Sequence, residues 1–311
     1  MNKLLSVIVL SYKNIDGVFK TLESVLAQDY QNIEIIVSDD GTPGFSEYID
    51  KIENYVNENK KENISNFFIN AIKVNAGTVK NINSAINLSK GDYIKLISAE
   101  DIFSKTEALS TFVSFLEESD FMIAFAKMRG VTPEGEYKYN LLSCESDYDL
   151  LKSYSVEQTL KRLYRRCFLP APGAIFKKEL FEENGLFKED TRLIEDYPYW
   201  MHLSMNGVAF GYIDEVLIDY KLSGVSSAGS YSEMFMQDML VIYDKYIFPY
   251  DKRFGVLQPF YNMLKRGGLN FYIAEAKRSK MSMGEKLVAR IKYFPFYVFV
   301  KLQNFLNGLK K

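Results

Sequence analysis

The chain has 311 residues, of which 47% are hydrophobic and 25% are charged. Because a typical domain has about 150 residues, we expect one large domain with an appendage or two domains, with enough apolar residues for a substantial core. The formal net charge of −2 gives no overall attraction to nucleic acid, so we do not expect a nucleic-acid-binding protein.

The first elements predicted are a strand, a helix and a second strand. Residues 4–12 form a continuous, mainly apolar run, which is typical of a strand buried on both faces of a parallel sheet. Apolar residues at helical spacing follow over 18–30, and 32–40 has the pattern of another buried strand. This βαβ unit ends in Asp39 and Asp40. Ligands of open α/β sheets bind at the carboxyl ends of strands, so both side chains are candidates for function.

Helices and strands continue to alternate up to residue 103. We expect an amphipathic helix that passes into a charged loop over 47–63, a strand over 67–74, a helix over 78–90 and a strand over 92–98. Glu100 and Asp101 then follow the last strand, again at a carboxyl end. Four strands alternating with helices predict a doubly wound, mostly parallel α/β sheet with a nucleotide-binding half.

The pattern is mixed beyond residue 104. We expect helices over 105–119, 155–166 and 177–185, strands over 121–131 and 209–222, a turn over 132–136 and a loop over 168–176. The segment 194–207 contains the acidic pair Glu195 and Asp196. Residues 230–311 have a mainly helical pattern, and the sequence shows no internal repeat.

The cysteines and the apolar runs indicate where the protein works. Cys144 and Cys167 are too few for a disulfide framework, and the sequence has no Cys/His cluster that would hold zinc. No run reaches the roughly 18 apolar residues that a membrane span needs. We therefore expect both thiols to be reduced and any catalytic part to lie in the cytoplasm.

Acidic residues occur at three well-spaced places: SDDGT at 38–42, SAED at 98–101 and IEDY at 194–197. A sugar-nucleotide site needs an acceptor for the base, a carboxylate for the ribose, a cation or basic residue for the diphosphate and a general base for the acceptor hydroxyl. The simpler alternatives are a turn at Asp39 and Asp40, and acidic starts of helices at the other two places.

Five segments, taken together, carry a resemblance to a known family. They are SVIVLSYKN, SVLAQDYQNIEIIVSDDGT, NAGTVKNINSAINLSKGDYIKLISAED, GAIFKKELFEENGLFKED and IEDYPYWMHL. In this order, between residues 4 and 227, they resemble the inverting glycosyltransferase family 2 of bacterial surface-polysaccharide synthesis, with its GT-A fold and Rossmann-like nucleotide-binding half.

The resemblance implies the following division of the chain. A GT-A catalytic domain would cover 1–228, with a nucleotide-binding half over 1–103 and an acceptor-binding half over 104–228. A mainly helical extension would follow over 229–311. The partners implied are a UDP-sugar donor and a glycan or lipid-linked glycan acceptor.

For the nucleotide, the resemblance implies a site at the ends of the first two strands. Leu10, Ser11 and Tyr12 would line it, with the Tyr12 ring stacked near the base. Asp40 would accept from the ring N–H of the base, and Asp39 would orient the loop. A uracil offers such an N–H, which favours UDP.

The resemblance places the sugar and the diphosphate at the third strand end. Ser98 and Ala99 would line the donor site, Glu100 would take the ribose hydroxyls, and Asp101 would ligate Mg²⁺ or Mn²⁺. The basic residue that the family often has in the next helix is not in its usual place, but Lys80 is close enough to reach the diphosphate.

For catalysis, the resemblance implies that Asp196 is the general base on the acceptor hydroxyl and that Glu195 supports it. The sequence departs from the family in having SAED where a more acidic strand end is usual. It also lacks the histidine that many members carry after the last strand. The cation would then rest on Asp101, phosphate oxygens and water, which predicts weak binding without the nucleotide.

These departures leave one alternative to an enzyme: a non-catalytic nucleotide-sugar-binding or scaffolding protein on the same fold. A second alternative concerns 286–311, where basic residues mix with aromatic and aliphatic ones. Such a segment is suited to peripheral contact with an anionic membrane, on the inner face of the cell membrane. It is equally suited to packing on the catalytic domain or to forming a homodimer.

Overall fold

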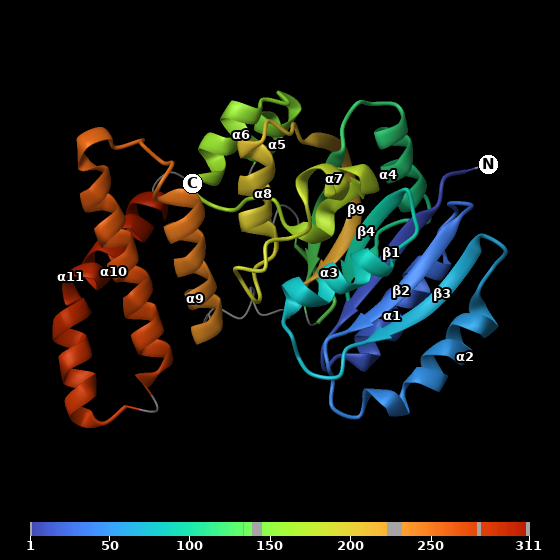
Figure 1. Ribbon diagram of the computed structural model, residues 1–311, viewed down its shortest axis with the longest axis horizontal. Coiled ribbons are helices and arrows are strands. Elements are labelled where there is room, and N and C mark those ends of the chain that lie inside the picture. The colour runs from blue at the N-terminus through green and yellow to red at the C-terminus, as the bar shows by residue number, and fades with distance from the viewer. Residues whose placement is uncertain (1, 133, 139–144, 223–231, 279–280, 309–311) are drawn as a thin grey trace. The chain divides into compact units, whose positions relative to one another are not determined.

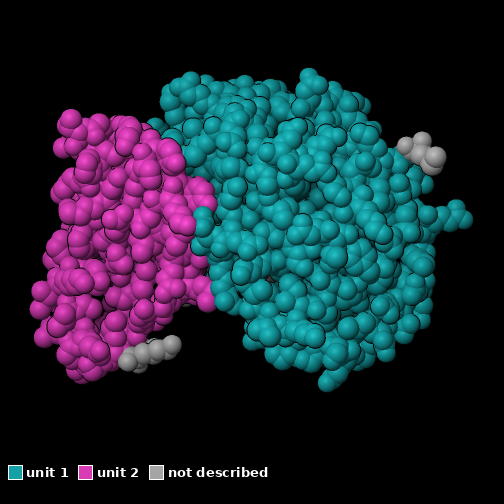
Figure 2. Space-filling view, in the orientation of Figure 1, with its two compact units in different colours: residues 1–224 teal, residues 225–311 magenta. Residues whose placement is uncertain are grey.

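The structure is a computed structural model that describes residues 2–132, 134–138, 145–222, 232–278 and 281–308. Within this part of the chain a nine-stranded sheet runs in the order β3-β2-β1-β4-β8-β6-β9-β5, and β7 pairs with β6. The chain divides into two compact units, residues 1–224 and 225–311 (Figure 2).

The first half of the sheet is parallel, as predicted (Figure 1). It consists of β1 (Leu5–Ser11), β2 (Ile33–Asp39), β3 (Ile64–Ala71) and β4 (Tyr93–Ser98). Every residue of β2 is buried, which explains why its sequence is a continuous rather than an alternating apolar run. The register pairs Ser11 with Asp39 and places Leu10 between Ser38 and Ser98, so the three strands end at one edge.

Helices cover both faces of this half. They are α1 (Ile15–Leu26), α2 (Ile49–Asn59), α3 (Thr78–Leu88) and α4 (Ala108–Glu117). In β1, Val7 and Val9 belong to the core that α1, α2 and α4 share, whereas Ile8 is buried on the other face, because successive side chains of a strand alternate. The Asn14 side chain begins α1 by accepting from Gly17 N–H at 3.1 Å.

The second half of the sheet is mixed. Its strands are β5 (Ile102–Phe103), β6 (Ile123–Val131), β7 (Tyr137–Lys138), β8 (Ala174–Lys177) and β9 (Gly211–Lys221). The helices around it are α5 (Glu145–Lys152), α6 (Val156–Leu163), α7 (Lys178–Asn184) and α8 (Asp196–Met205), with a short 3₁₀ turn at Ala171–Gly173 (η2). A second 3₁₀ turn, Phe45–Glu47 (η1), precedes α2 in the first half.

The prediction of a loop over 168–176 is wrong at its end, because residues 174–177 form β8. This strand pairs antiparallel with both β4 and β6. A four-residue strand gives little sequence signal, and its pairing partners lie far away in the sequence. The buried Lys95 of β4 also holds this region, since its ammonium donates to the carbonyls of Pro172 and Ala174.

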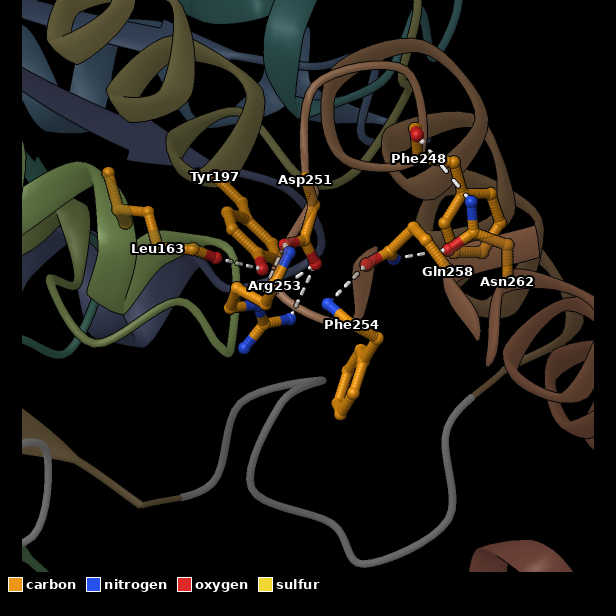
Figure 3. Close-up of polar contacts among 8 residues, drawn as sticks. All are labelled: Leu163, Tyr197, Phe248, Asp251, Arg253, Phe254, Gln258 and Asn262. Atoms are coloured by element: carbon orange, nitrogen blue, oxygen red, sulfur yellow. Dashed lines mark hydrogen bonds and ion pairs between the residues drawn. The ribbon is translucent and has the colours of Figure 1, made fainter. Parts of the chain in front are cut away.

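The second unit is helical, as predicted. It contains α9 (Glu233–Ile242), a π-helical turn at Tyr243–Ile247 (η3), a 3₁₀ turn at Gly255–Leu257 (η4), α10 (Gln258–Ala276) and α11 (Met283–Gly308). Buried polar groups hold the turn before α10 (Figure 3). Asp251 accepts from the Arg253 guanidinium at 2.7 Å, and Gln258 accepts from Phe254 N–H at 3.1 Å. Among the described helices, none combines the length and the apolar character needed to span a bilayer.

An aromatic cluster forms the core behind β6 and β8. Trp200 is fully buried; its ring meets that of Phe125 edge-on at 5.1 Å, and its indole N–H donates to the Leu169 carbonyl at 2.6 Å. The other members are Phe176, Phe187, Tyr199 and Phe210.

We predict that Trp200→Ala lowers the free energy of unfolding by about 3–5 kcal/mol, because the change leaves a cavity and an unpaired carbonyl. Urea denaturation monitored by circular dichroism measures this. Leu88→Ala, at a side chain that is 45% exposed, is the control and should change the free energy by less than about 0.5 kcal/mol. Equal effects of the two substitutions would contradict the prediction.

Candidate active site

The carboxyl ends of β1, β2 and β4 bring most of the predicted site residues together. Beyond the strands, Asp40 N–H donates to the Ser11 carbonyl at 2.9 Å, and Ala99 N–H donates to the Leu10 carbonyl at 2.8 Å. Ser98 is the last residue of β4 and pairs with Leu10. Residues 10–11, 39–40 and 98–99 therefore form one continuous edge.

Asp39 holds the turn that follows β2. Its buried carboxylate accepts from Thr42 N–H at 2.7 Å and from the Thr42 hydroxyl at 2.6 Å. The same hydroxyl accepts from Lys13 N–H at 2.6 Å. Asp39 thus connects the loop after β2 with the loop after β1, which is what an orienting residue would do.

Asp40 is bound to the loop before α3. Its carboxylate accepts from Ala76 N–H at 2.7 Å, from Gly77 N–H at 2.9 Å and from the Asn75 amide at 2.7 Å. Burial raises the pKa of Asp40, although these backbone donors and Arg192 lower it. Three donors occupy most of the roughly four acceptor positions of a carboxylate, so one position remains for a ligand.

Arg192 connects this loop to the third acidic segment, and the sequence analysis missed it. Its guanidinium donates to the Asn75 carbonyl at 2.9 Å, and its own carbonyl accepts from Val79 N–H at 3.2 Å. Gly77 has a φ of +97°, and a Cβ there would lie 2.3 Å from Cγ of Arg192. The glycine in NAGT indicated in the sequence that another part of the chain comes close to the backbone here. The sequence did not indicate that this part is Arg192.

Glu100 has a strained backbone with a φ of +84°. Its N–H donates to the Thr21 hydroxyl at 3.0 Å and to the Gly17 carbonyl at 3.2 Å, so α1 holds it in this conformation. Its carboxylate lies 3.8 Å from the Lys20 ammonium and is partly exposed. A non-glycine residue in the left-handed region is uncommon and is often found at functional sites.

Asp101 is 3% exposed, and only part of its hydrogen-bonding capacity is used. Its Oδ1 accepts from Lys221 N–H at 2.8 Å, whereas its Oδ2 has no hydrogen-bond partner within the described residues. Ser11 Oγ is a second buried atom without a partner there. Burial raises the pKa of Asp101 to about 7, against the lowering effects of Lys221 N–H and of the Lys95 ammonium. Buried polar atoms without partners in a native protein require an explanation.

The residues around Asp101 fit a cation held by one protein ligand. In the part of the chain that the structure describes, no group of three or more His, Cys, Asp or Glu residues is arranged to hold a metal ion. The unpartnered Oδ2 of Asp101 offers one carboxylate oxygen, the type of ligand that Mg²⁺ prefers, and Mg²⁺ commonly combines one or two carboxylates with phosphates and water. Segment 223–231, which lies between β9 and α9 in the sequence, is outside the described residues.

Asp196 is the first residue of α8 and is partly buried. Its Oδ1 accepts from Tyr197 N–H at 2.6 Å, and its Oδ2 accepts from the Cys167 thiol at 3.7 Å. Burial raises the pKa of Asp196 to about 6, and these donors lower it. Burial followed by the Asp196 charge raises the pKa of Cys167, which keeps the thiol protonated as a donor. Glu195 immediately precedes the helix and is also partly buried.

Two predicted residues stand outside this network. The Tyr12 ring is 44% exposed just after β1, with the Lys13 ammonium 5.0 Å from its centre. Lys80 lies on the exposed side of α3. Neither makes a hydrogen bond to the carboxylates in the described structure. The predicted Cys144 lies outside the described residues.

Comparison with known proteins identifies the family. The family model described as Glycosyl transferase family 2 matches residues 6–185, which is more than half of the chain. The chain belongs to glycosyltransferase family 2. This confirms the resemblance seen in the sequence.

Relatives of the chain include uncharacterised glycosyltransferases and proteins named for a specific transfer reaction. An uncharacterised glycosyltransferase of Rickettsia felis is 28% identical over 70% of this chain and 33% of its own length. WfaP of Escherichia coli, named UDP-Glc:alpha-D-GlcNAc-diphosphoundecaprenol beta-1,3-glucosyltransferase, is 24% identical over 76% of this chain and 84% of its own length. The chain spans about a third of the length of the three Rickettsia relatives it matches first.

Solved structures of transferases share the fold of this family 2 chain. S. aureus TarS 1–349 in complex with UDP has a TM-score of 0.59 at 18% identity, covering 98% of this chain and 91% of TarS 1–349. The mannosyltransferase PcManGT of Pyrobaculum calidifontis, in complex with GDP-Man and Mn²⁺, has a TM-score of 0.59 at 16% identity, covering 98% and 85%. The predicted GT-A fold is confirmed.

The pKa of Asp101 predicts a pH dependence of stability. Because its pKa is raised in the folded state, Asp101 contributes stability that is present at low pH and lost as the pH rises from about 4 to about 7. Asp101→Asn removes this contribution. We expect the free energy of unfolding of the wild type, relative to the variant, to be roughly 2 kcal/mol higher at pH 5 than at pH 8.

Urea denaturation at the two pH values measures this difference. Asp50→Asn, at an exposed aspartate of α2, is the matched control and should follow the wild type at both. A wild type and an Asp101→Asn variant that change in parallel would show that Asp101 is ionised normally in the fold.

Proposed function

We propose that the protein is an inverting glycosyltransferase that moves a hexose or N-acetylhexosamine from a UDP-sugar to a glycan or lipid-linked glycan hydroxyl, in bacterial surface-polysaccharide synthesis on the cytoplasmic side. The observation that carries the proposal is the edge formed by β1, β2 and β4. Within the described residues, two buried atoms there, Ser11 Oγ and Asp101 Oδ2, lack partners, and the first two acidic pairs, Asp39–Asp40 and Glu100–Asp101, follow the ends of β2 and β4 in the part of the chain that matches family 2.

The choice of donor rests on Asp40 and on the relatives. The acceptor position that its three donors leave open suits the ring N–H of uracil. The name of E. coli WfaP includes UDP-Glc, and S. aureus TarS has been solved in complex with UDP-GlcNAc. Leu10, Ser11 and Tyr12 would line the base, and Ser98, Ala99 and Glu100 would line the ribose and the sugar.

The acceptor is proposed from the relatives as well. E. coli WfaP is named for a diphosphoundecaprenol-linked acceptor, and a Bacillus spizizenii relative, 26% identical over 64% of this chain, is named poly(ribitol-phosphate) beta-glucosyltransferase. Both names include a phosphate-containing acceptor. A hydroxyl of a lipid-linked or polymeric glycan is therefore the acceptor class that we would test first.

Asp101 would hold Mg²⁺ or Mn²⁺ through its unpartnered Oδ2. When bound, the cation would neutralise the charge that develops on the departing diphosphate. Lys80, on the exposed side of α3, is the basic residue proposed to contact the diphosphate.

Asp196 would act as the general base. Its carboxylate takes the proton of the acceptor hydroxyl while the hydroxyl oxygen attacks the anomeric carbon. The bond to UDP breaks on the opposite face, UDP leaves with the electron pair, and the configuration inverts. A pKa of about 6 suits this task, because the carboxylate is largely ionised at pH 7 and is still a stronger base than an ordinary aspartate. Glu195 would support it.

We predict that Asp196→Asn lowers turnover by a factor of about 10²–10⁴, the usual contribution of a general base, while leaving the affinity for UDP unchanged. Release of UDP from UDP-Glc and UDP-GlcNAc, with Mn²⁺ and diphospholipid-linked or polyol-phosphate acceptors, measures turnover, and calorimetry measures affinity. Below pH 6 the kcat/KM of the wild type should fall about tenfold per pH unit.

Asp50→Asn is the matched control, since this aspartate is exposed on α2. It should keep wild-type turnover and UDP affinity. Tight UDP binding by the wild type, without turnover of any donor, would reject the enzyme and favour the scaffolding alternative.

We predict that Asp101→Asn weakens Mn²⁺ binding in the presence of UDP by at least about tenfold, because it replaces the carboxylate ligand with an amide. Since the cation competes with a proton on a group of pKa about 7, Mn²⁺ affinity of the wild type should also fall as the pH drops below 7. Titration of UDP-bound protein with Mn²⁺ at pH 6 and pH 8 measures both. A wild type that binds UDP equally well with EDTA and with Mn²⁺ would exclude a cation-bridged diphosphate.

A further inference from the structure

Helix α11 carries a continuous stripe of exposed apolar side chains. Their exposed fractions run from 47% at Val298 to 81% at Met283. They are spaced three or four residues apart, so they lie on one face of the helix. The outer stripe consists of Met283, Leu287, Ile291, Phe294, Val298 and Leu302.

The other face of α11 already has its partner. Figure 1 shows α10 and α11 side by side, and a Cβ on Gly267 of α10 would lie 2.1 Å from the Phe296 ring. Tyr297 and Phe271 also pack together at 5.2 Å between ring centres. The outer stripe is therefore not needed to hold these two helices together. Six large apolar side chains exposed in one row indicate an interaction surface.

The charges beside the stripe indicate the chemistry of its partner. Arg290 and Lys301 each follow a stripe residue by three positions, so they border the stripe on the helix surface. Lys286 and Lys292 add two further cations, whereas Glu285 is the sole acid in the sequence of α11.

The excess of basic over acidic residues extends over the whole second unit. Residues 225–311 contain 14 lysines and arginines and six aspartates and glutamates, a formal net charge of +8. Residues 1–224 contain 24 basic and 34 acidic residues, a formal net charge of −10. The near-neutral total of the chain thus conceals a strongly basic unit that carries the outer stripe.

We propose that the outer stripe of α11 docks on the surface of a bilayer that contains anionic lipids. A second copy of the chain would bring two surfaces of the same positive sign together, which is unfavourable. An anionic bilayer instead offers phosphates for the bordering lysines and arginines and an apolar layer for the stripe. The helix would lie in the plane of the interface rather than cross it.

The proposal does not depend on the proposed function, because it concerns a different surface and a different ligand. If the acceptor is lipid-linked, however, docking would bring the enzyme to the surface where its acceptor is held. Binding energy in this mode comes from partial burial of apolar side chains and from attraction to anionic headgroups, and the second contribution is screened by salt.

Co-sedimentation of the full chain with lipid vesicles tests the proposal. We expect binding to vesicles of phosphatidylcholine with about one third phosphatidylglycerol, at least about tenfold weaker binding to pure phosphatidylcholine, and loss of most of this difference in 0.5 M NaCl. Equal binding to the two compositions, or no binding to either, would overturn it.

Substitutions locate the contact. Ile291→Ser combined with Phe294→Ser should reduce vesicle binding at least about tenfold, because it removes two apolar groups from the middle of the stripe. Arg290→Gln combined with Lys301→Gln should reduce binding to the anionic vesicles alone. Leu88→Ser, at a comparably exposed leucine of α3, is the matched control and should bind like the wild type.

Light scattering after size-exclusion chromatography tests whether a second copy of the chain, rather than a membrane, covers the outer stripe. A dimeric wild type that becomes monomeric on Ile291→Ser and Phe294→Ser, with vesicle binding unchanged, would assign the stripe to self-association and reject the membrane. The far-UV circular-dichroism spectrum of each variant, expected to equal that of the wild type, verifies that the variant is folded.

Discussion

The parallel pairing of β1 with both β2 and β4 is the constraint on which the rest of the structure depends. Parallel strands in register end at a common edge, so Leu10 lies between Ser38 and Ser98. Where the ladder stops, the following backbone groups need other partners. Asp39 and Asp40 supply them by accepting from the loops that come next. The carboxylates that the family resemblance assigns to nucleotide binding therefore also hold the loops in place. One side chain can do both.

The buried carboxylates of the candidate site carry an energetic cost. Burial raises the pKa of Asp40, Asp101 and Asp196, which means that the fold disfavours their ionised forms. Asp40 is compensated by three donors, whereas Asp101 has one backbone donor and the attraction of Lys95. A buried carboxylate with too few donors lowers the stability of the fold. Such a residue is typical of functional sites, where a bound group supplies the missing interaction. A bound cation would be such a group for Asp101.

The first half of the fold was predictable because each of its elements has a strong local signal. The continuous apolar runs of β1, β2 and β4 and the periodic helices between them fixed the order of elements. β5, β7 and β8 have two to four residues each, and their pairing depends on partners far away in the sequence. The same reason explains why Arg192 was missed. Nothing near residue 192 indicates that its guanidinium reaches Asn75, whereas Asp40 and Asp101 stand at strand ends that the pattern located.

The negative charge of the first unit affects both proposed interactions, the one with the nucleoside diphosphate and the one with the membrane. The first unit has a formal net charge of −10, and a nucleoside diphosphate is also an anion, so the two repel each other unless a cation lies between them. An anionic bilayer would repel that unit for the same reason. The basic residues of 225–311, two of which border the outer stripe, would supply the opposite sign at the proposed membrane surface, as a divalent cation on Asp101 would supply it at the diphosphate. If both proposals hold, an acidic unit acting on anionic substrates at an anionic surface would need both.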